Sequence, residues 1–517
     1  MRAGAPLADD AVTPPEPRQV GQKARRGISW NLAGAVVTNA MRLVVVVVLG
    51  RILDPGEFGV VAAALSVTII LHNLRDLGIG PALIQRAEID RAHVATAFAV
   101  AAYLGLGIAA LLVLAAPLIG ELYGIPESVD VLRALGAIFV LRGIATASSV
   151  MCQRAMRFRA IAIVDAATYT AGAAASIVLA TAGAGPWSLV GGYLLEEALS
   201  AALYLRLYPP PITLRIDRAR LAELLGYGVS QSVIQLAGIL ATYGDNFVVG
   251  RSLGKDALGY YTRAYDLIKL PSAIFTNIVG NVLFPAFSRL QHDPARLASS
   301  FRRITFLNAL VLLPASAVLI AIAPEVIRLL MGRGWSTAVV PFQILAITML
   351  FRTSYKVGAM VASAAGLVHK VALANVVYMA VVIGGAAIAI RWGITGVAAS
   401  TAIALCVVYA LCSALALAAS GLSAGAFLRA HLPGLAFAAL AGGPSWLLAE
   451  ALRAAAWPFA AVVVAVALAA LALWAGALAL ALRRGRGDFA WLGDELRRVF
   501  ARLRRKHPAP EEPPGAA

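Results

Sequence analysis

A ten-residue phrase, GRILDPGEFG at residues 50–59, returns as GRSLGKDALG at residues 250–259, an offset of 200 residues. Four of the ten positions are identical, and each copy follows a long apolar run. Two weaker echoes keep the same order at a similar offset: Leu141-Arg142 with Phe351-Arg352, and Gly185 with Gly393. Together the echoes predict a chain built from two copies of one structural unit.

The composition indicates that lipid surrounds most of the chain. Of 517 residues, 60% are hydrophobic and 14% are charged, whereas soluble domains average about 45–50% apolar and about 25% charged residues. The mean hydropathy is +0.80. A soluble domain of this length has too little interior to bury so much apolar surface, so we predict a membrane protein.

Apolar runs of roughly 20 residues, the length that crosses the hydrocarbon core, predict an all-α membrane protein with about fourteen transmembrane helices. The predicted spans cover residues 28–50, 58–79, 92–119, 131–150, 160–181, 187–205, 223–249, 257–285, 304–327, 339–365, 371–390, 394–419, 430–449 and 457–482.

The distribution of basic residues supports this count. With both termini in the cytoplasm, 30 of the 44 Lys and Arg residues fall on the cytoplasmic side, 7 on the opposite side and 7 within spans. Cytoplasmic loops of membrane proteins collect Lys and Arg in this way. The formal charge of +17 is therefore interpreted as topology, and nucleic acid is not an expected partner. We expect a multi-pass protein of the bacterial inner membrane.

The echoes divide the predicted helices into two parallel six-helix repeats plus two C-terminal helices. Six is an even number, so both repeats have the same orientation and are related by an axis along the membrane normal, with a substrate site between them. The predicted order is a disordered cytoplasmic N-terminal tail, a first six-helix bundle, a cytoplasmic linker, a second six-helix bundle, two extra helices and a basic cytoplasmic C-terminal tail: 1–27, 28–205, 206–222, 223–419, 430–482 and 483–517.

Ionisable residues within spans are functional candidates, because each costs several kcal/mol in a bilayer unless it faces a cavity or a partner. The basic candidates for substrate binding are Arg42, Arg142, Arg263, Lys269, Arg352 and Lys356. Guanidinium groups bind phosphate oxygens through two donors at once, so these residues predict a cationic lumen for a phosphate-bearing substrate. For Arg263 and Lys269, structural pairing with Asp266, three residues from each, is an equal alternative.

The acidic residues within spans are candidates for coupling transport to a proton or sodium gradient: Asp165, Glu196, Glu197, Asp245 and Asp266. Pairing with the arginines is the alternative interpretation. The sequence does not identify the coupling ion.

No feature of the sequence indicates an enzyme, so no catalytic residue, cofactor or metal is predicted. The loops between spans are too short for a domain, a Gly-x-x-x-x-Gly-Lys-Ser/Thr motif is missing, and the three cysteines lack the spacing of a metal or disulfide site. The basic C-terminal tail is amphipathic between Phe489 and Leu503. Anionic membrane lipids are its expected partner, and a solvated tail is the alternative.

Three segments resemble the bacterial lipopolysaccharide or O-antigen flippases of the multidrug/oligosaccharidyl-lipid/polysaccharide exporter superfamily. They are GISWNLAGAVVTNAMRLVVVVVLGRILDPGEFGVVAAAL at 27–65, GDNFVVGRSLGKDALGYYTRAYDLIKLP at 244–271 and VLFPAFSRLQ at 282–291. The resemblance runs from about residue 25 to 420, and its most specific part begins at Gly244-Asp245-Asn246-Phe247.

The resemblance implies two six-helix bundles around a cationic lumen that opens alternately to each side. The implied substrate is an undecaprenyl-diphosphate-linked oligosaccharide, moved from the cytoplasmic to the periplasmic leaflet for lipopolysaccharide or exopolysaccharide synthesis. A polysaccharide polymerase and chain-length proteins are candidate partners. No family motif designates the lumen charges as site residues.

Three alternatives remain open. A multidrug exporter of the same superfamily would favour an acidic, aromatic lumen, and a polysaccharide polymerase or ligase would lack the repeat and carry a large outer loop. A flippase for lipid-linked peptidoglycan precursors has chemistry too similar to separate by sequence. The sugar, the coupling ion and the oligomeric state are not predicted.

Overall fold

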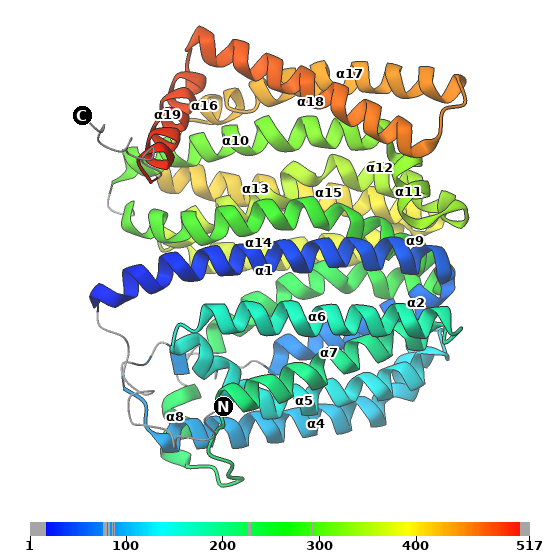
Figure 1. The fold of residues 1–517 in the computed structure, drawn as a ribbon, viewed down its shortest axis with the longest axis vertical. Coiled ribbons are helices and arrows are strands. Elements are labelled where there is room, and N and C mark those ends of the chain that lie inside the picture. The colour runs from blue at the N-terminus through cyan, green and yellow to red at the C-terminus, as the bar shows by residue number, and fades with distance from the viewer. Residues whose placement is uncertain are drawn as a thin grey trace, which may run out of the picture. The chain divides into compact units, whose positions relative to one another are not determined.

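The computed structural model describes residues 17–75, 80, 83, 84, 86, 88–225, 229–290 and 293–506, and all regular structure in these ranges is helical (Figure 1). The helices are α1 Pro17–Ile52, α2 Pro55–Arg75, α4 Arg91–Tyr123, α5 Ser128–Arg154, α6 Phe158–Thr181, α7 Pro186–Leu207, α8 Arg218–Leu225, α9 Val229–Leu290, α10 Pro294–Ala321, α11 Ala323–Met331, α12 Val339–Ile347, α13 Met349–Ala364, α14 Val368–Ala389, α15 Gly393–Ser420, α16 Ala424–Arg429, α17 Leu432–Ala454, α18 Phe459–Arg484 and α19 Asp488–Lys506. Two 3-10 turns, η2 Arg333–Ala338 and η3 Ile390–Trp392, link neighbouring helices.

The helices agree with the predicted membrane spans. Among the described residues, ten helical stretches are long and apolar enough to cross a membrane, and the stretch Val368–Ser420 contains two predicted spans, α14 and α15. The three remaining predicted spans lie in α7 and α9. The adjacent carboxylates Glu196 and Glu197 lower the hydropathy of α7. The chain is therefore an all-α, multi-pass membrane protein, as predicted.

Helix α9 joins the seventh and eighth predicted spans. Gly254 interrupts it with φ 81° and ψ −177°, a conformation that is open to glycine and strained for other residues. The interruption lies inside the second copy of the repeated phrase. It separates two helical arms that the sequence analysis placed in two different spans.

The ends of the chain are more helical than predicted. Helix α1 begins at Pro17, within the segment assigned to a disordered tail, and residues 1–16 lie outside the described residues. Helix α8 takes in the end of the predicted linker, residues 218–222, and the first three residues of the predicted second bundle. Most of the predicted C-terminal tail forms α19, with residues 507–517 outside the description.

The chain divides into two compact units. The first comprises Met1–Ile274, Ile327–Leu345 and Val368–Leu411, and the second comprises Phe275–Val326, Ala346–Leu367 and Cys412–Ala517. In the first unit α4 packs along α5, and α6 packs between α1 and α7 (Figure 1). In the second unit α10 packs against α13 and α17. The limits of the two predicted bundles stay a prediction.

The amphipathic helix α19 packs one of its faces against α10 within the second unit. The Phe489 ring meets that of Phe306 edge to face at a centroid distance of 5.1 Å. Asp488 forms an ion pair with Arg302 at 2.9 Å, and the guanidinium group of Arg303 lies 4.8 Å from the Trp491 ring centroid. The face that the sequence analysis assigned to lipid is therefore partly covered by protein.

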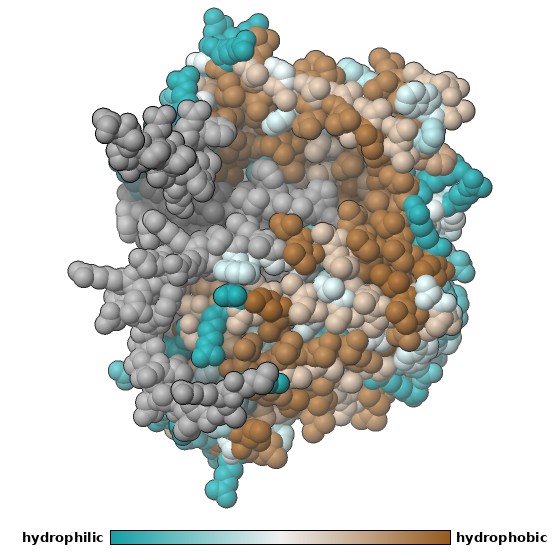
Figure 2. Space-filling view, viewed as in Figure 1, coloured by the Kyte–Doolittle hydropathy of each residue, from teal (hydrophilic) through white to brown (hydrophobic). Residues whose placement is uncertain are grey.

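Large apolar side chains cover much of the surface, as a lipid-facing protein requires. Leu106, Leu114 and Leu118 of α4 are 58%, 80% and 59% exposed. The face in Figure 2 is largely hydrophobic, and its hydrophilic residues gather mainly at the margins. Lipid tails solvate such side chains, which explains why they need no protein partner.

The two copies of the repeated phrase lie against each other in the first unit. A Cβ atom placed on Gly59 would lie 1.8 Å from the carbonyl oxygen of Lys255, and one on Gly259 would lie 1.8 Å from that of Pro55. Pro55 and Lys255 occupy equivalent positions in the two copies, as do Gly59 and Gly259. The contact is therefore reciprocal, as a two-fold relation between the repeats produces.

The segments beside the two copies of the phrase also make equivalent contacts. Gly50 lies against Met331 at the end of α11, whereas Gly250 lies against Tyr123 at the end of α4. Arg51 donates to the carbonyl oxygen of Leu329 at 2.7 Å, and Trp335 donates to that of Gly50 at 2.9 Å. We call residues 50–59, 123–127, 250–259 and 329–335 the clasp.

An exposed ion pair adds to the clasp. The ammonium group of Lys255 donates to Glu127 at 2.5 Å. This hydrogen bond lowers the pKa of the Glu127 carboxyl group. The pair joins the loop before α5 to the interruption in α9, although an exposed pair of this kind adds little to stability.

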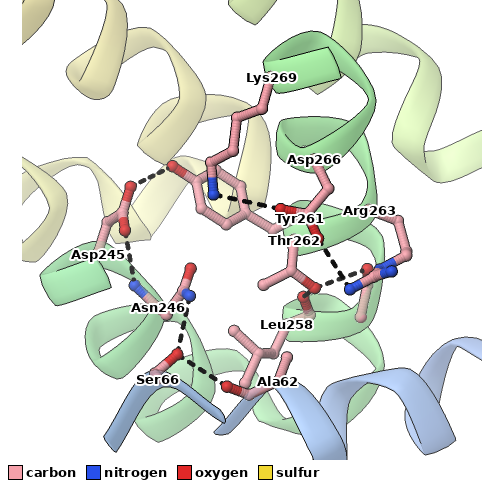
Figure 3. Close-up of polar contacts among 11 residues, drawn as sticks. Ala62, Ser66, Asp245, Asn246, Leu258, Tyr261, Thr262, Arg263, Asp266 and Lys269 are labelled. Carbon is pink, nitrogen blue, oxygen red and sulfur yellow. Dashed lines mark hydrogen bonds and ion pairs between the residues drawn. The ribbon is translucent and has the colours of Figure 1, made fainter. Parts of the chain in front are cut away.

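A second buried contact joins α9 to α2 and α15. Asp245 is 1% exposed and accepts hydrogen bonds from Tyr261 at 2.6 Å and from Thr401 at 3.3 Å. The adjacent Asn246 donates to Ser66 of α2 at 2.9 Å (Figure 3). The most specific part of the family resemblance therefore holds three helices together, and the partners of Asp245 are hydroxyl groups and the backbone N–H of Asn246.

Substituting either clasp glycine should weaken the clasp. Gly59→Ala or Gly259→Ala places a methyl group against a backbone carbonyl that cannot rotate away, and overpacking of this kind costs about 1–3 kcal/mol. We expect a lower apparent Tm for the purified protein in detergent. Gly107→Ala is the matched control, since a Cβ on Gly107 meets nothing within 4 Å. Equal Tm values for all three variants would contradict the packing described.

Tyr261→Phe should destabilise the protein, because it removes a donor from the buried carboxylate of Asp245. A hydrogen bond to a charged group contributes about 1.5–3 kcal/mol. The control is Tyr260→Phe, since Tyr260 donates to the carbonyl oxygen of Gly334 at an exposed site. Thermal unfolding followed by tryptophan fluorescence should show the larger decrease for Tyr261→Phe, and the reverse order would refute this assignment.

Candidate functional site

Two chambers lie side by side in the first unit and share Arg42 and Tyr169. The first, which we call the polar chamber, has a volume of about 450 Å³. Its polar lining comes from α1, α2, α5, α6 and α7: Thr38, Arg42, His72, Arg142, Thr146, Ser149, Gln153, Asp165, Thr168, Tyr169, Glu196, Glu197, Ser200 and Tyr204.

The second, which we call the basic chamber, has a volume of about 370 Å³. It lies among α1, α2, α6, α7 and α9, with an apolar wall that includes Leu49 and Phe58. Its charged and polar lining is Arg42, Ser66, Tyr169, Tyr193, Tyr243, Asn246, Thr262, Arg263, Tyr265, Asp266 and Lys269.

An ion pair crosses the polar chamber. Arg142 of α5 donates to Glu197 of α7, and its other terminal nitrogen lies 2.7 Å from Nε2 of His72 on α2. Arg142 therefore joins α5 to both α7 and α2 across this chamber. Nearby, Tyr204 donates to Asp165 at 2.9 Å.

One carboxylate bridges two cations in the basic chamber. Asp266 pairs with Arg263 at 2.8 Å and with Lys269 at 3.2 Å (Figure 3). The Arg263 guanidinium carbon lies 4.9 Å from the ring centroid of Phe58, and Nζ of Lys269 lies 4.2 Å from that of Tyr265. The alternative of structural pairing therefore holds for this helix, and the pairing leaves the chamber basic.

Arg42 lies where the two chambers meet. Its guanidinium carbon is 5.8 Å from the ring centroid of Tyr169. Among the ion pairs of the described residues, Arg142, Arg263 and Lys269 each have a carboxylate partner and Arg42 has none. Arg42 is thus the chamber cation without an ion pair in the described part of the chain, and it retains donors for an anionic ligand beside its contact with Tyr169.

Eight of the eleven predicted site residues line the chambers, and three do not. Asp245 is not among the described residues that line them, because its carboxylate faces Tyr261 and Thr401. Arg352 and Lys356 lie one turn apart on α13 in the second unit, where Arg352 is buried. Their place in the predicted cationic lumen stays a prediction.

The sequence analysis missed several lining residues that a helical pattern reveals. On α5 the polar positions Arg142, Thr146, Ser149 and Gln153 recur every three or four residues, and on α7 Glu196, Ser200 and Tyr204 recur every four. Each series forms one polar stripe on an otherwise apolar helix. Charge alone identified one member of each stripe, Arg142 and Glu196, and passed over the hydroxyl and amide groups.

Residues 48–340 match the polysaccharide biosynthesis protein family, which is more than half of the chain. Lipopolysaccharide biosynthesis protein WzxC of Escherichia coli is 25% identical over 336 residues, covering 64% of this chain and 68% of that protein. Succinoglycan biosynthesis transport protein ExoT of Rhizobium meliloti is 29% identical over 320 residues, covering 60% of this chain and 63% of that protein.

Solved structures share the fold. The lipid II flippase MurJ in an inward closed conformation has a TM-score of 0.68 at 13% identity, covering 87% of this chain and 99% of that chain. An inward-facing multidrug resistance transporter of the MATE family has a TM-score of 0.56 at 16% identity, covering 77% and 95%. At such low identity the likeness concerns the fold alone. On the sequence match, the chain belongs to the polysaccharide biosynthesis protein family.

Proposed function

We propose that the chain is a flippase that moves undecaprenyl-diphosphate-linked oligosaccharide from the cytoplasmic to the periplasmic leaflet, in lipopolysaccharide or exopolysaccharide synthesis. The observation that carries this proposal is the basic chamber, with Arg42, which forms no ion pair among the described residues, at its junction with a hydroxyl-rich chamber. Family membership, the name of the relative ExoT as a transport protein and the name of the structural neighbour MurJ as a flippase support it. It requires no catalytic residue, cofactor or metal.

The basic chamber suits a diphosphate. Arg42, Arg263 and Lys269 present three cations against one lining carboxylate, Asp266. Phosphate oxygens accept charge-assisted hydrogen bonds, and the guanidinium fork donates two at once. The apolar wall around the cations strengthens this attraction, because it keeps the local dielectric constant low.

Alternating access would use the clasp as a gate. Under the predicted topology the clasp lies at the periplasmic ends of the helices, since its basic residues belong to the minority on that side. The backbone contacts at Gly59 and Gly259 close that end in this structure. Release to the periplasm then requires the two copies of the phrase to separate.

We also propose that both termini lie in the cytoplasm and that the protein resides in the bacterial inner membrane. Anionic lipids are proposed to contact the exposed arginines of α19, among them Arg497 and Arg498. A polymerase and chain-length proteins are proposed partners. Glu196, Glu197, Asp165, Asp245 and Asp266 remain candidates for ion coupling, and Arg352 and Lys356 remain candidates for substrate contact.

A multidrug exporter is the second candidate, and one observation favours it. The polar chamber holds three carboxylates, Asp165, Glu196 and Glu197, against two guanidinium groups, an acidic excess that suits a cationic drug. The basic chamber argues against this function, because a cation would meet the charges of Arg42 and Lys269. Drug susceptibility of a deletion strain, compared with its lipid-linked glycan content, separates the two functions.

Arg42→Gln should impair flipping without damaging the fold, because no ion pair is broken. Loss of a charged hydrogen bond weakens binding by roughly ten- to hundredfold. We expect lipid-linked glycan to accumulate on the cytoplasmic face of a deletion strain complemented with this variant. The control is Arg133→Gln, which removes an exposed pair with Asp130. Accumulation with neither variant, at matched expression, would count against the role of Arg42.

Closing the clasp covalently should stop flipping. In a background in which the free cysteines Cys152, Cys406 and Cys412 are replaced by alanine, Glu127→Cys and Lys255→Cys place two thiols at a native ion pair. A short bifunctional thiol reagent should abolish flipping in proteoliposomes, and reduction should restore it. Each single cysteine variant is the control, and flipping that continued after complete cross-linking would exclude the clasp as a gate.

A further inference from the structure

The polar chamber differs from the basic chamber in the chemistry that it offers. Four of its side chains make no hydrogen bond or ion pair within the described part of the protein: Thr38, Gln153, Glu196 and Ser200. Unpaired polar groups in a membrane-spanning bundle are costly unless water or a ligand satisfies them. The chamber is therefore suited to a ligand rich in both donors and acceptors.

The groups that line this chamber match a sugar. A sugar hydroxyl donates to a carboxylate and accepts from an amide or guanidinium group, and the chamber presents all three in Glu196, Gln153 and Arg142. The rings of Tyr169 and Tyr204 add apolar surface for sugar C–H groups. A volume of about 450 Å³ falls within the range of small-molecule sites, roughly 300–1,000 Å³, and accommodates a few sugar rings.

The two chambers also differ in charge. The lining of the polar chamber has three acidic residues, Asp165, Glu196 and Glu197, against the two arginines Arg42 and Arg142. The basic chamber has an excess of positive charge. An extended ligand that spans both chambers therefore meets a positive field at one end and a weakly negative field at the other.

We infer that the polar chamber binds the sugars nearest the diphosphate and selects neutral or amino sugars over acidic ones. The inference rests on the proposed function and names the substrate class of the same site. Arg42, shared by both chambers, marks the junction between diphosphate and glycan. Glu196 forms no ion pair among the described residues, and with the neighbouring Glu197 and Asp165 it disfavours a sugar carboxylate by charge repulsion.

Equilibrium binding to the full-length protein in nanodiscs tests the inference with three probes. They are undecaprenyl diphosphate, the same lipid with a neutral trihexose, and the same lipid with one hexose replaced by a uronic acid. Wild type should bind the neutral glycolipid on the order of tenfold more tightly than the acidic one, because two like charges would share a site of low dielectric constant. No ion gradient is present, so a coupling role of Glu196 does not affect the comparison.

Two variants and a control make the test specific. Glu196→Gln should reduce the preference for the neutral glycan to within about twofold, because the excess charge is gone. Gln153→Leu should weaken binding of the neutral glycolipid by roughly three- to tenfold and leave sugar-free undecaprenyl diphosphate unchanged. Glu121→Gln, at an exposed position on α4 outside both chambers, should behave as wild type.

The outcomes separate this inference from the proposed function. If wild type binds all three lipids equally and neither variant changes the affinities, the polar chamber is not a glycan site, while diphosphate binding leaves the flippase proposal standing. If wild type binds none of the three lipids, both the inference and the flippase proposal are wrong.

Discussion

An ionised side chain persists among membrane-spanning helices only where it meets a counter-charge or water, and this constraint organises the first unit. Arg142 is held by Glu197, and Arg263 and Lys269 share Asp266. The cost of leaving any of these groups in lipid is several kcal/mol. The helices that carry them, α5, α7 and α9, therefore turn their charged faces away from lipid and enclose polar space.

The same constraint gives the two chambers opposite character. Ion pairs neutralise most of the lining charges. Arg42 and Glu196 are lining residues of opposite charge that form no ion pair in the described part of the chain. The first unit thus has a basic chamber beside one with an excess of acidic residues, which fits a substrate whose two ends differ in charge. The cationic lumen expected from counting basic residues stays a prediction.

The clasp and the Asp245 contact show how a short repeated phrase builds this fold. Each copy of the phrase has a glycine where the two copies meet, at residues 59 and 259, because only glycine lets one backbone approach another so closely. Its second copy also contains Gly254, where α9 breaks. Asp245 then ties the two arms of α9 together through Tyr261 and reaches α15 through Thr401.

The sequence by itself determined the fold class, the membrane spans and the repeat. It also offered the pairing of Arg263 and Lys269 with Asp266 as one of two alternatives. These features depend on local hydropathy, on spacing along one helix or on identity between two segments. Only the tertiary structure decided that Arg142 meets Glu197, 55 residues away, that Asp245 is bound by Tyr261 and Thr401, and that hydroxyl groups such as those of Thr38 and Ser200 join the chamber. The helices that line the chambers carry lipid-facing and chamber-facing positions side by side. The packing of one helix against another, which no single-helix pattern contains, sets which face is enclosed.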